Sequence, residues 1–137
     1  MTPQKITVQA QIAADVNTVW KAYTQAEHIV NWNFAADTWC CPKASNELKV
    51  GGKYFARMEA KDGSFGFDFE AIYTEVIEGK NFTYEFGGRF CTITFEPIEN
   101  GTQLTIVFDP ETENPVDLQQ QGWQAILNNF KAYAESL

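Results

Sequence analysis

Histidine is almost missing from this chain of 137 residues, in which His28 is the only one. It lies beside Glu27 near the start of a predicted short helix, where we expect a solvated side chain rather than a general base. A nucleophilic serine or cysteine would have only this imidazole to activate it, so a catalytic triad is not expected. The sequence therefore predicts no catalytic residues.

Cysteine is also scarce, with only Cys40, Cys41 and Cys91 in the chain. Three cysteines are too few, and odd in number, for the disulfide framework of a small secreted protein, so we expect reduced thiols. Cys40 and Cys41 with His28 or Asp37 lack the second CxxC or HxxxH element that would complete four ligands. We expect neither a metal site nor a cofactor.

Basic residues and long hydrophobic runs are limited as well. Ten lysines and arginines against 18 acidic residues give a net charge of −8, which would repel nucleic acids and anionic membrane surfaces. The N-terminal stretch has no apolar core after a positive region, and no apolar run approaches the length of a membrane span. We therefore expect a cytoplasmic protein with no nucleic-acid or membrane partner. The glycine pairs at 51–52 and 87–88 lack the spacing of phosphate-binding loops and are interpreted as turns.

Aromatic residues, in contrast, make up 15% of the chain, and their spacing indicates the order of elements. Polar and apolar side chains alternate over residues 5–12, which predicts a half-buried first strand. Asp15 is placed to cap a helix, and Thr24 with Glu27 has the spacing of a capping box for a second short helix. The aromatic and small residues of 33–45 predict a loop.

The middle of the chain predicts an antiparallel meander of six strands, whose pairing follows from three turn dipeptides, Asp62-Gly63, Gly87-Gly88 and Asn100-Gly101. Counting outward from each turn predicts one buried aromatic face, which pairs Ala60 with Phe65, Met58 with Phe67, Ala56 with Phe69, Tyr84 with Cys91, Phe82 with Ile93, Phe95 with Ile106, and Ile93 with Phe108. The opposite face pairs Arg57 with Asp68 and Phe55 with Glu70, which predicts an exposed charged network rather than acid–base catalysts.

Residues 114–137 predict a long amphipathic helix, with Asn114 as its cap, Pro115 in the first helical position and Asp117 near the positive end of the dipole. Gly122 in the middle of this helix costs about 1 kcal/mol relative to alanine, so the missing side chain must be useful there. It either lets the helix approach a strand closely or leaves open volume above the sheet.

This order of elements predicts one α+β domain spanning residues 1–137, in which a curved antiparallel sheet of about seven strands wraps around the long C-terminal helix. Three stretches carry a resemblance to a known family: "ADVNTVWKAYTQAEHIVNW", "LKVGGKYFARMEAKDGSFGFDFEAIYTEV" and "TITFEPIENGTQLTIVFDPETENPVDLQQQGWQAILNNFKAYAE". With them the chain resembles, over nearly its whole length, the START-like (SRPBCC) superfamily with its helix-grip fold, also described as the birch-pollen-allergen type. Within it, the chain is similar to homologues of the activator of the ninety-kilodalton heat-shock protein's ATPase.

The resemblance implies several functions without choosing among them. Members of the superfamily bind apolar small molecules between sheet and long helix, some are cyclases or other enzymes, and the eukaryotic namesake domain stimulates a chaperone ATPase. Our leading hypothesis is the binding of an apolar or aromatic small molecule, such as a lipid or polyketide, in an internal cavity without intrinsic catalysis. The alternatives are a protein-interaction module that modulates a chaperone ATPase or stress response, and a cyclase or hydrolase.

For such a cavity we predict an apolar lining with a small number of polar groups. Arg89, Cys91 and Gln119 are the polar side chains that strand parity or helix phase turns inward, where they could orient a ligand's carboxylate or hydroxyl. The predicted ligand-binding residues are Trp32, Trp39, Met58, Phe67, Phe69, Arg89, Ile93, Gln119, Gly122, Trp123 and Ile126.

Overall fold

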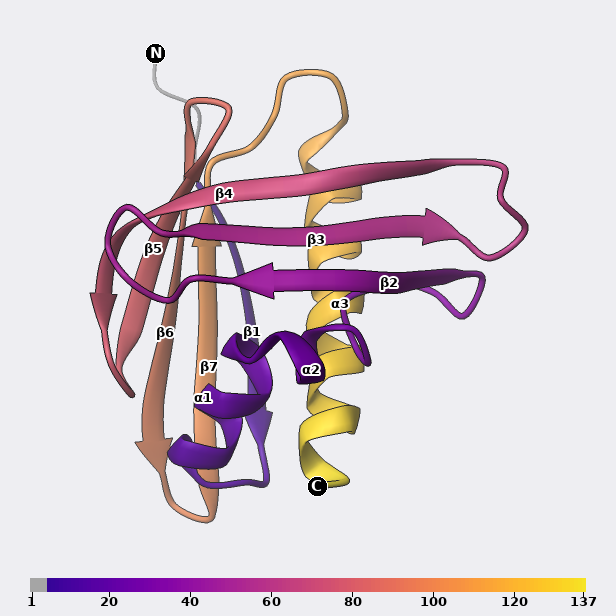
Figure 1. The fold of residues 1–137 in the computed structure, drawn as a ribbon. Coiled ribbons are helices and arrows are strands. Elements are labelled where there is room, and N and C mark those ends of the chain that lie inside the picture. Colours follow the sequence, from indigo (N-terminus) through magenta and orange to yellow (C-terminus); the bar gives the residue numbers. More distant parts are fainter. Residues whose placement is uncertain (1–4) are drawn as a thin grey trace.

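The computed structural model describes residues 5–137, and its elements follow the predicted order (Figure 1). Along the chain these are β1 (Ile6–Ile12), α1 (Val16–Thr24), α2 (Ala26–Ile29), β2 (Trp39–Asn46), β3 (Lys53–Ala60), β4 (Gly66–Ile77), β5 (Asn81–Phe86), β6 (Arg89–Ile98), β7 (Gly101–Phe108) and α3 (Val116–Glu135). The strands form one antiparallel sheet in the order β1-β7-β6-β5-β4-β3-β2. The predicted helix-grip architecture is confirmed.

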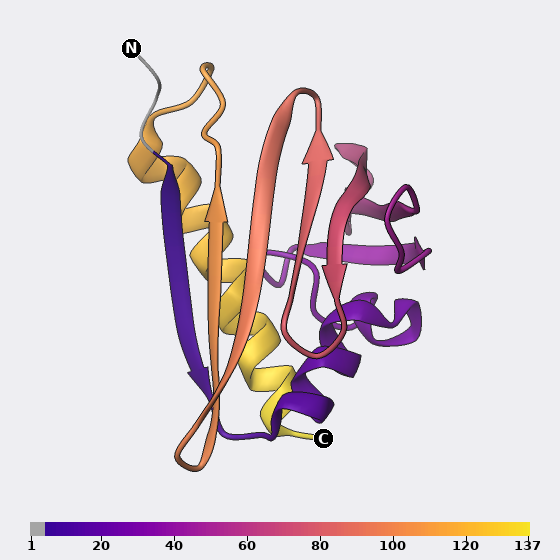
Figure 2. The same ribbon diagram turned by 90° about the vertical axis from the view of Figure 1, so that its left-hand side faces the viewer.

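The sheet curls around α3 because its two ends run in different directions. In Figure 1, β1, β6 and β7 run along the helix, whereas β2, β3 and β4 cross it. Figure 2 shows the same curl from the side, with α3 inside the curve and the two short helices close to its C-terminal end. One end of the groove is therefore closed by α1 and α2, and no helix of residues 5–137 covers the other end.

Two of the three predicted hairpin registers are confirmed. Met58 pairs with Phe67 across β3 and β4, and Tyr84 pairs with Cys91 across β5 and β6. The third register is wrong by two residues, because Glu99 and Asn100 form the turn and Gly101 already belongs to β7.

The physical reason for this shift is the close approach of β1 to Gly101. A Cβ atom at this glycine would overlap the carbonyl oxygen of Ile12, so only glycine fits here. The left-handed turn position is instead occupied by Asn100, with φ of 66°. Ile93 consequently pairs with Ile106, not with Phe108, while the buried face is unchanged because a shift of two residues preserves strand parity.

Three local predictions are also corrected. Residues 39–45 of the predicted loop belong to β2, which pairs with β3 across an irregularity between Cys40 and Lys43. Thr24 does not cap α2, because its hydroxyl donates to the carbonyl of Trp20 inside α1. At α3 the cap is Pro115, one residue later than predicted, and no side chain caps this end.

The buried residues of α1 and of the C-terminal half of α3 pack against the sheet. Trp20 packs edge-on against Phe95, and Tyr23 packs against Phe130 of α3. In α3 the fully buried residues are Leu127, Phe130 and Ala134, all in its C-terminal half. The N-terminal half of α3 is less deeply buried, and the candidate site lies beneath it.

Candidate ligand-binding cavity

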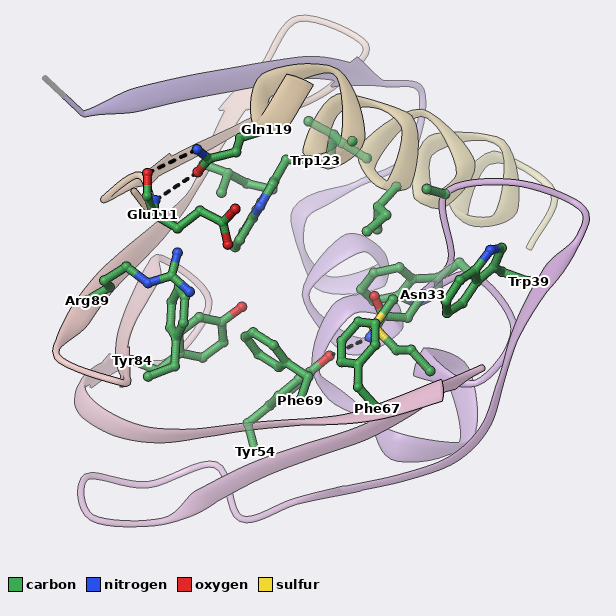
Figure 3. Close-up of a pocket in the computed structure, with 18 of the residues that line it drawn as sticks. Asn33, Trp39, Tyr54, Phe67, Phe69, Tyr84, Arg89, Glu111, Gln119 and Trp123 are labelled. Atoms are coloured by element: carbon green, nitrogen blue, oxygen red, sulfur yellow. Dashed lines mark hydrogen bonds between the residues drawn. The ribbon is translucent and has the colours of Figure 1, made fainter. Parts of the chain in front are cut away.

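A cavity of about 500 Å³ lies between the aromatic face of the sheet and the N-terminal half of α3 (Figure 3). Its size falls within the range of small-molecule sites, about 300–1,000 Å³. Ten of the eleven predicted ligand-binding residues line it: Trp32, Trp39, Met58, Phe67, Phe69, Arg89, Gln119, Gly122, Trp123 and Ile126.

Gly122 faces open space. A Cβ atom at this position would meet no heavy atom within 4 Å outside its own helical neighbourhood. Of the two interpretations of this glycine, close packing of helix on strand is therefore wrong, and open volume above the sheet is confirmed.

Ile93 is the predicted lining residue that the structure places elsewhere. It is fully buried in β6 and does not border the cavity. The reason is that α1 covers this part of the sheet, with Trp20 packed against Phe82 and Phe95. Cys91, the third inward polar group, is also fully buried in the core and does not line the cavity.

Gln119 lines the cavity, but its amide is occupied by the loop that precedes α3. Its oxygen accepts a hydrogen bond from the Glu111 amide at 2.8 Å, and its nitrogen donates to the carbonyls of Glu111 and Asn114. Both bonds to Glu111 are visible in Figure 3. The side chain therefore holds the β7–α3 loop in place rather than presenting a free group to a ligand, which corrects the predicted role.

Several lining residues were missed, and strand parity could have identified two of them. Tyr54 and Tyr84 lie on the same face as residues that were named, and both border the cavity. Burial holds the pKa of both tyrosines well above its ordinary value, so their phenols are neutral. Asn33, from the segment after α2, donates to the Tyr54 hydroxyl at 3.2 Å and brings an amide to the cavity wall. No sequence pattern indicated that contact.

A ladder of stacked planar groups forms the wall next to β6 and β7. The indole of Trp123 stacks on Phe108 with ring centroids 3.9 Å apart, and it also stacks with Phe86, whose ring centroid is 6.3 Å away. The guanidinium of Arg89 lies over the ring of Phe86, 4.7 Å from its centroid. This ladder fixes the distance between α3 and the sheet. It also fixes the position of Arg89, the one cationic side chain among the described lining residues.

The cavity opens next to an aromatic cluster, defined here as the half-buried Trp39 with the exposed Phe65 and Phe67. Their ring centroids are 6.0 to 6.3 Å apart. Phe65 and Phe67 are 62% and 41% exposed, so the prediction that this end of the aromatic face is buried is wrong. The tips of β2, β3 and β4 extend past α3 in Figure 1, which explains why this helix does not cover the rings of Phe65 and Phe67.

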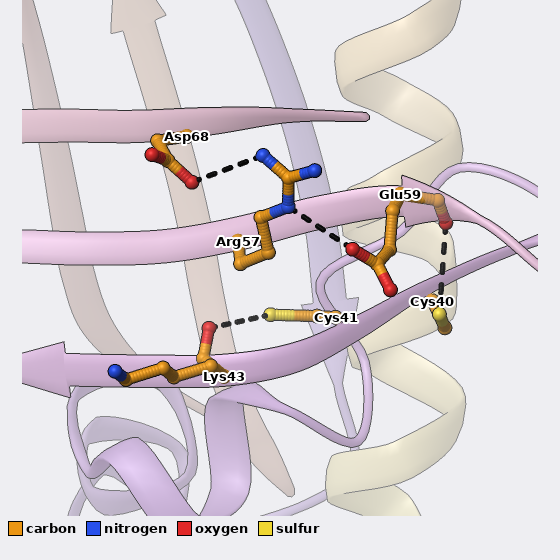
Figure 4. A network of polar contacts seen from close by, with 6 residues as sticks. All are labelled: Cys40, Cys41, Lys43, Arg57, Glu59 and Asp68. Atoms are coloured by element: carbon orange, nitrogen blue, oxygen red, sulfur yellow. Dashed lines mark hydrogen bonds and ion pairs between the residues drawn. The ribbon is translucent and has the colours of Figure 1, made fainter. Parts of the chain in front are cut away.

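The charged network of β3 and β4 is confirmed on the opposite face of the sheet (Figure 4). Arg57 donates to Glu59 at 3.0 Å and to Asp68 at 3.2 Å, and Lys53 pairs with Glu70 at 2.8 Å. These side chains are partly exposed and do not border the cavity. They stabilise the pairing of the strands rather than forming a reactive site.

Other groups with reactive side chains lie outside the cavity. His28 is half-buried rather than fully solvated, since its Nδ1 lies 2.6 Å from the hydroxyl of Tyr133. Cys40, Cys41 and Cys91 are free thiols. Within residues 5–137 no three histidine, cysteine or acidic side chains form a group that could hold a metal ion. Over the same residues, every helix is too short or too polar to cross a membrane.

Fold and cavity together define a helix-grip protein with an apolar internal cavity. The chain belongs to the family described as activator of Hsp90 ATPase homolog 1-like protein, whose model matches residues 13–135. No curated protein matches it.

Solved structures agree with this assignment. An AHSA1-like protein from Aeromonas hydrophila is 36% identical, with a TM-score of 0.92 over 97% of this chain and 93% of that chain. A protein from Cytophaga hutchinsonii is 44% identical, with a TM-score of 0.83 over 96% of this chain and 92% of that chain. One from Chromobacterium violaceum is 25% identical, with a TM-score of 0.85 over 97% and 99%.

Proposed function

We propose that the protein binds an apolar or aromatic small molecule in the cavity beneath the N-terminal half of α3. Gly122 is the observation that carries this proposal. A helix-interior glycine reduces stability by about 1 kcal/mol relative to alanine, and here no neighbouring atom requires it. Its use is the space that it leaves opposite the aromatic face.

The lining supports an apolar ligand rather than a polar one. Most of the residues that border the cavity are aromatic or aliphatic, and the tyrosines among them are neutral. The described lining residues include no histidine and a single carboxylate, that of Glu111, so they favour neither a cyclase nor a hydrolase.

Titration with N-phenyl-1-naphthylamine, an uncharged fluorescent probe, tests the proposal directly. The wild-type protein should bind the probe, and Gly122→Leu should weaken binding by at least about tenfold because the leucine fills the space that the probe occupies. Gly122→Ala, which adds one methyl group, is the matched control and should reduce affinity much less. Unchanged binding in a folded Gly122→Leu variant would contradict the cavity as the binding site.

A second candidate function is the modulation of a chaperone ATPase, which the description of the family suggests. The aromatic cluster of Trp39, Phe65 and Phe67 favours it, because Phe65 and Phe67 are exposed and exposed aromatic groups are typical of interface hot spots. If this function holds, Phe65→Ser should abolish stimulation of the ATPase, whereas Gly122→Leu should leave it intact. Stimulation lost in Gly122→Leu alone would contradict a role through this surface.

A further inference from the structure

The guanidinium of Arg89 is held at the cavity by a cation–π contact with a ring, not by an ion pair. It lies 4.7 Å from the centroid of the Phe86 ring, as the end of the ladder that includes Trp123 and Phe108. The five N–H donors of arginine lie in the plane of its guanidinium, so a contact with a ring face does not use these donors. Figure 3 shows Arg89 at the same end of the cavity as Glu111 and Gln119.

The acidic groups nearest to Arg89 are engaged elsewhere. Asp109 accepts from the Lys5 ammonium at 2.5 Å and from the Phe90 amide at 2.9 Å. The carboxylate of Glu111 accepts from the side-chain amide of Asn114. Arg89 itself forms no ion pair with any residue of the part of the chain that the structure describes.

This arrangement departs from the electrostatics of the rest of the chain. The protein carries a net charge of −8, yet the only cationic side chain among the described lining residues is unpaired and preorganised. An arginine whose edge is free at the end of an apolar cavity matches a carboxylate, which accepts two parallel hydrogen bonds from the guanidinium.

We propose that the ligand is an aromatic or polycyclic acid whose single carboxylate pairs with Arg89 while its apolar body lies under Gly122. This inference rests on the proposed function and names the class of ligand for the same cavity. The neighbouring Glu111 opposes an anion and would favour a cation, so the two side chains predict opposite effects when they are neutralised.

A matched pair of probes tests the inference. N-phenyl-1-naphthylamine is neutral, and 8-anilinonaphthalene-1-sulfonate has the same ring system with one added anion, which stands for the carboxylate. Arg89→Gln should weaken binding of the anionic probe by at least about tenfold, equivalent to about 1.4 kcal/mol, and change binding of the neutral probe by less than about twofold. Glu111→Gln should strengthen binding of the anionic probe and leave binding of the neutral probe unchanged.

Two further variants serve as controls. Arg89→Lys keeps the charge but loses the planar fork, so it should lie between wild type and Arg89→Gln. Arg57→Gln removes a guanidinium from the opposite face of the sheet and should not change the binding of either probe.

The outcomes separate the two proposals. Equal weakening of both probes in Arg89→Gln would mean that Arg89 supports the cavity wall, and would overturn the inference. The inference would also be overturned if Arg89→Gln left binding of the anionic probe unchanged, or if Glu111→Gln weakened it. In each of these cases the neutral probe still binds wild type, so the proposed function stands. If neither probe binds wild type, the proposed function itself fails.

Discussion

The indole of Trp123 stacks on the ring of Phe108 with 3.9 Å between centroids and 15° between planes, and the residue before this tryptophan has no side chain. The two positions act together. Trp123 fixes the distance between α3 and β7, and Gly122 keeps the space beside that contact open. A large anchor next to a missing side chain thus creates a cavity without loosening the helix.

Burial separates two phenylalanines that share the concave side of the sheet. Phe108 is fully buried, so Phe108→Ala should lower the free energy of unfolding by about 3 to 5 kcal/mol. Phe67 is 41% exposed, and Phe67→Ala should cost only about 1 to 2 kcal/mol. Urea denaturation of both variants measures the difference. Equal losses would show that the β3–β4 tip covers Phe67 in solution.

Two Gly→Ala substitutions should change the free energy of unfolding in opposite directions. Gly122→Ala meets no atom within 4 Å and improves helix propensity, so it should stabilise the protein by about 0.5 to 1 kcal/mol. Gly101→Ala places a methyl group against the carbonyl oxygen of Ile12 and should destabilise by about 1 to 3 kcal/mol. The midpoints of chemical unfolding give both values. A destabilised Gly122→Ala would mean that α3 lies closer to the sheet than the structure places it.

The sequence predicts most of the fold because its patterns are local. The dipeptides Asp62-Gly63 and Gly87-Gly88 serve as turns and define correct registers. Asn100-Gly101 looks like the same turn dipeptide, but its glycine serves another purpose. Gly101 is required because β1, which is distant in sequence, approaches it closely. The strand β2 was missed because Pro42 and neighbouring small polar residues obscure the alternation of a strand.

The cavity was predicted less completely, for a physical reason. Strand parity determines which face a residue occupies, but not whether a helix or open space lies above it. Ile93 and Met58 share a face, yet α1 covers the first and the cavity lies above the second. Likewise, parity turns Arg89 inward, but it does not show that Asp109 pairs with Lys5, a residue that is distant from it in the sequence.

The three thiols should differ in reactivity in the native protein. Cys40 is partly exposed, whereas burial raises the pKa of Cys41 to about 11 and raises that of Cys91 further. Because the thiolate is the reactive form, Cys40 should react with a thiol reagent first and Cys91 only after unfolding. Labelling after denaturation without reductant should find three thiols. A single thiol would reveal a disulfide and contradict the expected reducing compartment.

The pair between Lys5 and Asp109 should contribute to stability in a pH-dependent way. The hydrogen bond from Lys5, followed by that from the Phe90 amide, lowers the pKa of Asp109. The folded state therefore favours the carboxylate, and this contribution is present above the ordinary pKa of aspartate and is lost as the pH falls through the lowered value. Lys5→Gln should reduce stability at neutral pH by less than about 1 kcal/mol, because both groups are partly exposed. The difference from wild type in denaturation should shrink in acid.

The same substitution should also weaken binding of an anion at the cavity. Without Lys5, the Asp109 carboxylate loses its cationic partner and becomes available to Arg89, whose charge already contributes to lowering the pKa of Asp109. Lys5→Gln should therefore reduce affinity for 8-anilinonaphthalene-1-sulfonate by several-fold, on the order of 1 kcal/mol, and leave N-phenyl-1-naphthylamine unaffected. Adding Asp109→Asn to Lys5→Gln removes the competing carboxylate and should restore the affinity for the anion. If the double variant binds the anionic probe as weakly as Lys5→Gln alone, competition for Arg89 is not the cause.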